Sequence, residues 1–275
     1  MSGFISSVPD NFRGFSHVKN SQNHKITPNS FQSDLLQMVK ERPGLTAQVF
    51  NLAEAKNGVE HAILTEGPPI RCKPRRQTQK NSKLQKSCSI FMVEVGIAAW
   101  SCSPWACPLH IAPKPWWPLV AVGGRWWPCW DFRRLNTVTI KDRYTIPRIQ
   151  DFVANLEGRR IFSKVDLVKG FHQIPIWKED QPKTAISTQF GLFEFKWMPF
   201  GLCNAAQTFQ RLMDNVFQDL DFLFVYLDDV LVASRSRNEH KKHLQILFDR
   251  LEEHGLVIHD KNANLVSKKL YSWGI

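Results

Sequence analysis

The stretch FLFVYLDDVLVAS, from Phe222 to Ser234, places two adjacent carboxylates inside an otherwise almost wholly apolar run. Successive side chains of a β-strand point to opposite faces of its sheet. A tight turn at Leu227-Asp228-Asp229-Val230 would present at least one acid at the sheet edge and keep the flanking apolar side chains in the core. The stretch therefore predicts two strands joined by a hairpin that carries Asp228 and Asp229.

Two neighbouring carboxylates in an apolar setting need something to neutralise them. Unit charges of one sign about 4 Å apart repel by roughly 4 kcal/mol at an effective dielectric of 20, and burial adds a desolvation cost. No Lys or Arg occurs between Asp221 and Ser234, which leaves shared protons, bound cations, or a turn that exposes both acids. Because Asp is common in turns, the pair alone also fits a purely structural hairpin.

A third carboxylate favours the cation-binding alternative. The segment RRIFSKVDL, residues 159–167, has the pattern of a strand that ends at Asp166. If this strand neighbours the hairpin, Asp166 and Asp228 converge. Carboxylate oxygens suit Mg²⁺ or Mn²⁺, and two such ions about 3.5–4 Å apart stabilise both oxygens of an in-line phosphoryl displacement. The three acids predict a site for two divalent ions.

The pattern around these acids predicts an α+β fold. Apolar periodicity, capping residues and glycines indicate helices over 147–158, 205–220 and 236–255, a short one near Leu35 to Lys40, an extended stretch FGLFEFKWMPFGL over 190–202, and a strand starting at 255. Helices and strands in this order favour an antiparallel sheet with helices on one face. By contrast, the segment from Trp105 to Trp130, with six tryptophans and several prolines, follows neither helical nor strand periodicity.

The composition of the chain indicates the kind of partner and the compartment to expect. Lys and Arg number 36 and Asp and Glu 25, and this net charge of +11 favours a polyanionic partner such as nucleic acid. A basic run from Arg71 to Lys86 contains no acid and fits either a solvated loop or import signal, or an arm that contacts phosphates. It consists of Arg71, Lys73, Arg75, Arg76, Lys80, Lys83 and Lys86. The six cysteines lack disulfide or zinc spacing, which indicates free thiols in a reducing compartment. No signal peptide or membrane-spanning run is evident.

Several boxes resemble reverse transcriptases, in the order expected of gypsy-type long-terminal-repeat retrotransposon polyproteins. The box YLDD resembles the Tyr-x-Asp-Asp motif, FSKVDLVKGFHQIPI the first catalytic box, and KTAISTQFGLFEFKWMPFGLCNAAQTFQRLMD the box between them. Further matches are WDFRRLNTVTIKDRYTIPRIQD, VEHAILTEGPPI and SPWACPLHIAPK. The resemblance covers roughly residues 56 to 275. It implies a right-hand polymerase with a fingers region over 56–150 and a palm over 151–275. Residues 1–55, which are polar, rich in Ser, Asn and Gln and weakly periodic, are expected to be a poorly ordered lead-in.

The resemblance also implies roles for individual residues. Asp166 and Asp228 would ligate two Mg²⁺ or Mn²⁺ ions, with Asp229 in support and the Leu167 carbonyl as a further ligand. Phe171 would lie beneath the sugar and reject a 2′-hydroxyl, the group that separates RNA from DNA building blocks; plain core packing is the alternative for this side chain.

Other residues would meet the nucleotide and the nucleic acid. Phe200 and Gly201 would floor the nucleotide pocket, and Lys114 and Arg133 would reach triphosphate and template from the fingers. Arg71, Lys73, Arg75 and Arg76 would contact nucleic acid. The implied partners are an RNA or DNA template–primer and deoxynucleoside triphosphates, with no membrane; the parent element would assemble in a cytoplasmic virus-like particle, with nuclear entry as an option.

The sequence departs from the family pattern in two places. Trp127 stands where the family has a triphosphate-binding Arg, with Arg125 two residues away as a substitute, and charge-assisted bonds to phosphate are strong ones. The chain also stops at YSWGI, where the family continues into the primer-gripping strands, and it contains no thumb, protease, ribonuclease H or integrase segment.

Three functions are compatible with these observations. The first is an RNA-directed DNA polymerase core, and the second is a nucleic-acid-binding module of the same fold without turnover. The third is an unrelated metal-dependent phosphatase, which would not need MPFGL and YLDD in this order. The three intact acids favour the first, whereas Trp127 and the missing thumb favour the second.

Overall fold

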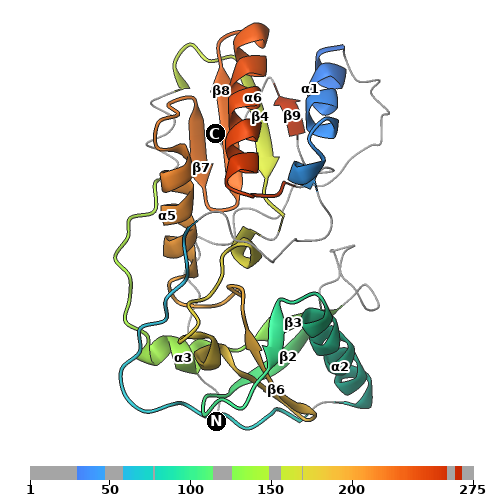
Figure 1. Cartoon of the computed structure of the whole chain (residues 1–275), viewed down its shortest axis with the longest axis vertical. Coiled ribbons are helices and arrows are strands. Elements are labelled where there is room, and N and C mark those ends of the chain that lie inside the picture. The colour runs from blue at the N-terminus through green and yellow to red at the C-terminus, as the bar shows by residue number, and fades with distance from the viewer. Residues whose placement is uncertain are drawn as a thin grey trace, which may run out of the picture.

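The computed structural model describes residues 30–46, 58–76, 78–113, 126–148, 156–168, 170–258 and 264–267. Its strands form two sheets, one of four strands and one of five. Figure 1 shows the four-stranded sheet with α5 and α6 in one part of the chain, and β2, β3, β6 and α2 in the other. The expected disorder of residues 1–55 falls largely outside the described residues, but α1 (Ser30–Lys40) confirms and lengthens the short helix expected near Leu35.

The four-stranded sheet is antiparallel throughout and has the order β7-β8-β4-β9. Its strands are β7 (Leu223–Tyr226), β8 (Asp229–Ser234), β4 (Ile161–Asp166) and β9 (Asn264–Ser267). The predicted hairpin and the strand ending at Asp166 are confirmed. The strand expected from residue 255 is displaced, because Ile258 forms only an isolated bridge to Leu167 and β9 begins at Asn264.

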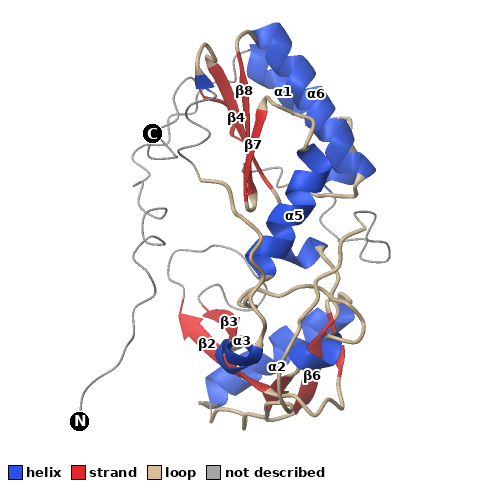
Figure 2. Cartoon of the chain, turned by 90° about the vertical axis from the view of Figure 1, so that its left-hand side faces the viewer, coloured by secondary structure: helices blue, strands red, loops and turns tan. Residues whose placement is uncertain are grey.

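Helices cover one face of this sheet, as predicted (Figure 2). They are α5 (Ala205–Phe217) and α6 (Arg237–Glu253). The predicted capping box begins α6: the Ser236 side chain accepts from Glu239 N and the Glu239 side chain accepts from Ser236 N, both at 3.3 Å. Gly255, at φ 66°, follows the end of α6 in the left-handed conformation that glycine adopts without strain. The helix expected over 147–158 lies mostly outside the described residues.

The second sheet was not predicted. Its order is β1-β6-β5-β2-β3, with a parallel pairing between β2 and β5. The strands are β1 (Ala98–Trp100), β2 (Cys107–Pro113), β3 (Trp126–Trp130), β5 (Ile186–Thr188) and β6 (Gly191–Phe195). The tryptophan-rich segment therefore contains two paired strands, β2 and β3, which its proline content concealed.

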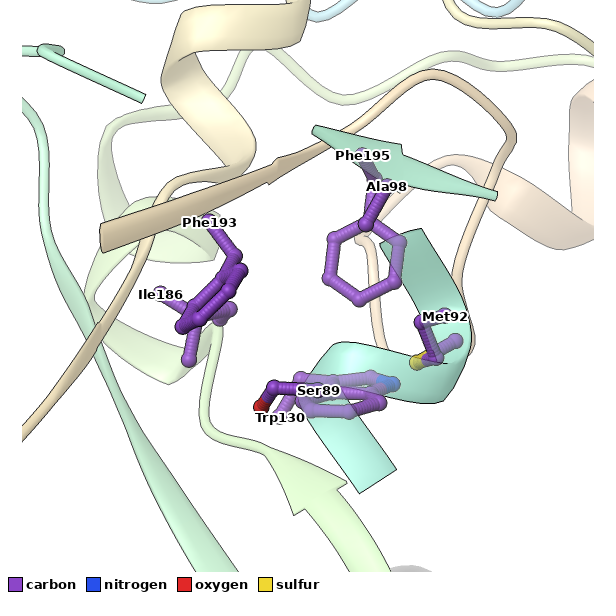
Figure 3. A pocket seen from close by; sticks show the side chains of 7 residues that line it. All are labelled: Ser89, Met92, Ala98, Trp130, Ile186, Phe193 and Phe195. Carbon is purple, nitrogen blue, oxygen red and sulfur yellow. The ribbon is translucent and has the colours of Figure 1, made fainter. Parts of the chain in front are cut away.

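Helix α2 (Gln79–Glu94) packs against this sheet. The interpretation of the whole basic run as a loop is wrong for its second half, since Lys80, Lys83 and Lys86 belong to α2. Between α2 and the sheet lies a small apolar cavity lined by Ser89, Met92, Ala98, Trp130, Ile186, Phe193 and Phe195 (Figure 3).

The remaining described segments connect or flank these parts. They include the helix α3 (Arg133–Val138) and the 3₁₀ turns η2 (Pro43–Thr46), η4 (Gly170–Gln173) and η5 (Gln181–Thr184). One contiguous cluster of buried apolar side chains runs from Leu109 and Phe195 of the five-stranded sheet to Val230 and Phe248 beside the four-stranded sheet.

Candidate active site

Two of the predicted acids face each other across adjacent strands. Asp166, the last residue of β4, pairs in register with Asp229, the first residue of β8. Alternation places both side chains on the face opposite α5 and α6, because Val165 and Val230 belong to the core cluster on the helical side. The sheet thus brings Asp166 directly against Asp229, while Asp228 lies in the adjoining turn.

That turn is a two-residue loop with a strained first residue. Tyr226 pairs with Asp229, so Leu227 and Asp228 form the loop. Leu227 has φ 52°, the positive value that the first central residue of a type II′ turn requires and that a leucine rarely adopts. Gln210 of α5, which is fully buried, holds the loop: its Oε1 accepts from Leu227 N at 3.3 Å and its Nε2 donates to Val225 O at 3.4 Å.

The carboxyl of Asp228 lies in a close-fitting niche. Its backbone carbonyl accepts a hydrogen bond from Leu167 N at 3.1 Å, which fixes the turn against the end of β4. A Cβ at Gly170 would lie 2.6 Å from Asp228 Oδ1 and 2.9 Å from the Phe209 ring, so only glycine fits there. Oδ1 of Asp228 is buried and has no hydrogen-bond partner among the described residues.

A lysine that the sequence argument overlooked lies between the two paired acids. Lys164 precedes Asp166 by two residues and shares its face of β4. Its Nζ lies 3.3 Å from Asp166 Oδ1 and 3.0 Å from Asp229 Oδ1. The contact with Asp166 is an ion pair without a well-aligned hydrogen bond, since Asp166 Oδ1 is a buried oxygen with no hydrogen-bond partner in the described part of the chain. The expectation left shared protons, bound cations or an exposing turn as the alternatives for these acids, and it is corrected by the ion pairs that Lys164 forms with two of them.

Electrostatics show that one lysine does not compensate three acids. Burial raises the pKa of Asp228 to about 7, and the charges of Asp229 and Asp166 add to that shift. Burial also raises the pKa of Asp166 to about 6, against the opposing effect of Lys164. The pKa of Lys164 is itself raised: burial opposes its charge, but Asp229 and Asp166 outweigh that effect. Additional positive charge would relieve this cluster.

The donor set fits hard divalent cations, although the carboxylates do not converge on one point. The described residues contain no ready-made group of three His, Cys, Asp or Glu ligands around a common centre. The unpartnered oxygens of Asp166 and Asp228 are nevertheless the donor type that Mg²⁺ and Mn²⁺ prefer. By the chemistry of their donor atoms, these residues fit such ions.

Aromatic side chains border the niche of Asp228. The Phe171 ring lies 4.9 Å from Phe200 in an edge-to-face contact and 5.4 Å from Phe209. Phe171 is only partly buried and packs against the main core. The structure thus brings Phe171 together with Phe200 and with the Phe209 ring, which borders Gly170 near Asp228, and core packing accounts for part of the Phe171 surface.

Gly201 and Arg133 lie on a second, open groove of about 290 Å³. Its lining comprises Arg75, His110, Cys129, Trp130, Asp131, Phe132, Arg133 and Gly201. Asn136 fixes one wall, since its Nδ2 donates to Gly201 O at 2.8 Å and its Oδ1 accepts from Cys203 N at 3.0 Å.

Asp131 gathers the two arginines of this groove. It accepts from Arg133 Nε at 2.7 Å and from Arg75 Nη2 at 2.5 Å. The hydrogen bond from Arg133 is the main reason that the pKa of Asp131 is lowered, and Arg75 contributes less. The Arg133 side chain is 80% exposed, so it remains accessible to an anion.

The other basic candidates divide into described and undescribed residues. The segment before α2 carries four exposed basic residues: Arg71, Lys73, Arg75 and Arg76. Arg71, at the start of this segment, forms an isolated β-bridge with Ala106. Lys114 and Arg125 lie outside the described residues. Trp127 pairs with Ala112 in the β2–β3 ladder, and its side chain is not described.

Sequence reasoning missed Lys164, Gln210 and Gly170. The alternation in FSKVD already places Lys164 on the face of Asp166, so that signal was present. Gln210 and Gly170 carry no such local signal, because their roles depend on contacts with Leu227 and Asp228.

We expect Gly170→Ala to displace the Asp228 carboxyl and the Phe209 ring, because the added methyl would overlap both. Overpacking of this kind costs about 1–3 kcal/mol. Urea unfolding should show that loss, and Mn²⁺ titration should show weaker binding. Gly44→Ala is the matched control for adding a methyl group, since its backbone does not need glycine and the only atoms near an added methyl are the end of the flexible Glu252 side chain, with Oε1 at 3.2 Å; equal losses in both variants would contradict the steric argument.

Comparison with known proteins defines the class to which this fold and site belong. The solved structure of the foamy viral protease-reverse transcriptase in complex with an RNA/DNA hybrid matches 87% of this chain and 32% of its own, with a TM-score of 0.73 at 20% sequence identity. This is the fold of reverse transcriptases.

The family model described as reverse transcriptase (RNA-dependent DNA polymerase) matches residues 122–271, and the chain belongs to that family. The retrovirus-related Pol polyprotein from transposon 297 of Drosophila melanogaster is 34% identical over 221 residues, 78% of this chain and 20% of that protein. The corresponding polyprotein from transposon gypsy of the same fly is 41% identical over 116 residues, 42% of this chain and 11% of that protein. The resemblance to gypsy-type elements is confirmed, and the chain spans about a fifth of the length of the transposon 297 polyprotein. No helix among the described residues is long and apolar enough to cross a membrane.

Proposed function

We propose that this chain is the core of an RNA-directed DNA polymerase that adds deoxynucleotides to a primer 3′-hydroxyl. The observation that carries the proposal is the pairing of Asp166 with Asp229 beside the turn that holds Asp228. Family membership supports it. The division into fingers over 56–150 and palm over 151–275 is part of the same proposal.

Three acids and one carbonyl would hold the cations. Asp166 and Asp228 are the principal ligands, Asp229 supports them, and the Leu167 carbonyl is a further candidate. When bound, Mg²⁺ or Mn²⁺ supplies Lewis-acid stabilisation of the attacking and leaving oxygens. The chain itself contributes rigidity: Gln210 holds Leu227 N, and Leu167 N holds the Asp228 carbonyl, so the acids are positioned before substrate arrives.

The neighbouring surfaces would bind the nucleotide and the template–primer. Phe171 and Phe200, whose rings pack against each other, would stack against a deoxyribose and base bound near Asp228. Gly201 and Arg133 belong to the groove that Asn136 braces, and Lys114 is proposed to reach the triphosphate. Arg71, Lys73, Arg75 and Arg76 are exposed and acid-poor in sequence, which suits contacts with phosphates of RNA or DNA.

The test is primer extension by the full chain on a poly-rA template with an oligo-dT primer, in Mg²⁺ or Mn²⁺. A filter-binding titration over a series of salt concentrations accompanies it. Metal-dependent extension supports the polymerase. Salt-dependent binding without extension at saturating metal and nucleotide would instead support the second function that Trp127 favours, a nucleic-acid-binding domain without turnover.

Phe171→Val should admit ribonucleotides, because the smaller side chain opens the space proposed to lie beneath the sugar. We expect the ratio of ribonucleotide to deoxyribonucleotide incorporation to rise by at least tenfold, about 1.4 kcal/mol of lost discrimination. Phe209→Leu replaces the neighbouring aromatic ring with a smaller aliphatic side chain and serves as the control for general loosening of the aromatic cluster. An unaltered ratio in an active Phe171→Val variant would assign Phe171 to core packing.

A further inference from the structure

Lys164 holds a position that the proposed polymerase chemistry leaves unexplained. Its ammonium bridges Asp166 and Asp229 at 3.3 Å and 3.0 Å, and its side chain is 27% exposed. Next to the acids, this face of the sheet carries a small buried apolar cluster, which includes Phe162 on β4 and Leu231 and Ala233 on β8. A lysine among them therefore serves the acids rather than the packing.

The ion pair competes with any cation for the same oxygens. A carboxylate oxygen in contact with an ammonium has a lone pair and a share of its charge already engaged. The ammonium lies 3.0 Å from Asp229 Oδ1 and is ion-paired with Asp166 Oδ1 at 3.3 Å, so a cation that approaches these two acids meets charges that are already partly compensated and a like charge beside them. The lysine stem is flexible and partly exposed, so the ammonium has a route away from the acids.

We infer that Lys164 is an internal counterion that occupies the carboxylate site and must be displaced when a divalent cation binds, so that it sets the metal affinity of this chain. The inference rests on the proposed metal site at Asp166, Asp228 and Asp229. In the absence of metal, the ammonium reduces the repulsion that would otherwise destabilise the end of β4 and the start of β8. On metal binding, that role passes to the cation.

The inference is tested by Mn²⁺ titration of the full chain, with free Mn²⁺ followed by electron paramagnetic resonance in the absence of nucleic acid and nucleotide. Lys164→Met keeps the length of the stem and removes the charge, and we expect its Kd for Mn²⁺ to fall about tenfold, equivalent to 1.4 kcal/mol. Lys164→Arg keeps the charge, and its Kd should stay within about threefold of wild type. Lys241→Met removes a lysine of α6 that pairs with Asp34 of α1, and it should leave the Kd unchanged.

Thermal unfolding adds a readout that does not depend on the affinity measurement. Lys164→Met should melt below wild type in EDTA, because the acids lose their counterion. On addition of Mn²⁺, the melting temperature of Lys164→Met should rise by more than that of wild type, because the cation meets no competing ammonium. The control Lys241→Met should show the wild-type increment.

The outcomes separate the inference from the function on which it rests. Asp228→Asn should weaken Mn²⁺ binding in every background if the metal site exists. If it does so while Lys164→Met binds Mn²⁺ no more tightly than wild type, the site stands and the counterion role is overturned. If neither wild type nor Lys164→Met binds Mn²⁺, the metal site itself is wrong and the inference falls with it.

Discussion

Asp228→Asn is expected to abolish primer extension, by a thousandfold or more, and at the same time to make the metal-free protein more stable at pH 7.5. Loss of one ligand to the proposed catalytic cations would remove several kcal/mol of transition-state stabilisation, and about 4 kcal/mol corresponds to a thousandfold in rate. The fold should be retained, because the turn is held through backbone groups: Leu167 N to the Asp228 carbonyl, and Leu227 N to Gln210.

The gain in stability follows from the electrostatics of the free site. Burial together with Asp229 and Asp166 raises the pKa of Asp228 to about 7, from an ordinary value of 3.8. A folded-state pKa above the unfolded value means that the ionised form is disfavoured in the fold at pH 7.5. Replacement by a neutral amide of the same shape removes that penalty, which amounts to about 4 kcal/mol. Sites that stay strained for function commonly show this trade-off.

The measurements are single-turnover primer extension and urea unfolding in EDTA. Asp249→Asn is the matched control, because it removes an exposed acid that pairs with Arg42 on the surface. We expect wild-type extension from this control and a change in unfolding free energy below about 1 kcal/mol. An Asp228→Asn variant that extends primers normally would disprove the metal site, and one that is inactive but less stable would disprove the strained-acid argument.

Local signals in the sequence were sufficient for most of the four-stranded sheet and the helices that cover it. The paired acids at the hairpin, the strand that ends at Asp166 and the capping box at Ser236 all depend on residues within a few positions of one another. Such features are set by turn chemistry, alternation and capping, which operate locally. The sequence therefore located the acids and the elements that carry them.

Features that depend on register between distant strands were not predictable in the same way. That Asp166 faces Asp229 rather than Asp228 depends on the alignment of β4 with β8, which a shift of one residue would reverse. The Lys164 bridge follows from the same register. The five-stranded sheet joins β2 to β5 across more than seventy residues, and its proline-bearing strands carry little alternation of their own.

Acidification should reveal a second electrostatic balance, centred on two buried histidines. His240 is fully buried between Ser163 and Ser234, whose hydroxyls lie 2.7 Å from its Nε2 and 2.8 Å from its Nδ1. His61 is equally buried, with Nδ1 2.8 Å from Thr208 Oγ1. Burial lowers the pKa of each to about 4 from an ordinary 6.5.

The sign of the effect follows from the direction of each shift. A histidine whose folded-state pKa is lowered contributes stability that is complete above pH 6.5 and is lost as the pH falls toward 4. At pH 5, each of the two histidines lowers the unfolding free energy by about 2 kcal/mol relative to pH 7.5. The raised pKa values of Asp228 and Asp166 have the opposite effect. As the pH falls through 7 and 6, these acids take up protons in the folded state, and together they raise the unfolding free energy by about 4 kcal/mol. The four shifts nearly cancel in the metal-free chain.

The cancellation leads to a specific expectation for urea unfolding in EDTA at pH 7.5 and pH 5.0. These four groups should change the unfolding free energy of wild type little between the two values. Asp228→Asn removes the larger of the two carboxyl contributions to this pH dependence. Its unfolding free energy should therefore fall by about 2–3 kcal/mol more than that of wild type on acidification. His240→Gln should show the reverse and gain about 2 kcal/mol relative to wild type over the same interval, whatever its stability at pH 7.5. His110→Gln, which changes an exposed histidine, is the control and should follow wild type. If Asp228→Asn and His240→Gln both follow wild type as well, burial does not hold these groups away from their ordinary pKa values, and the strained-acid account of the active site fails with it.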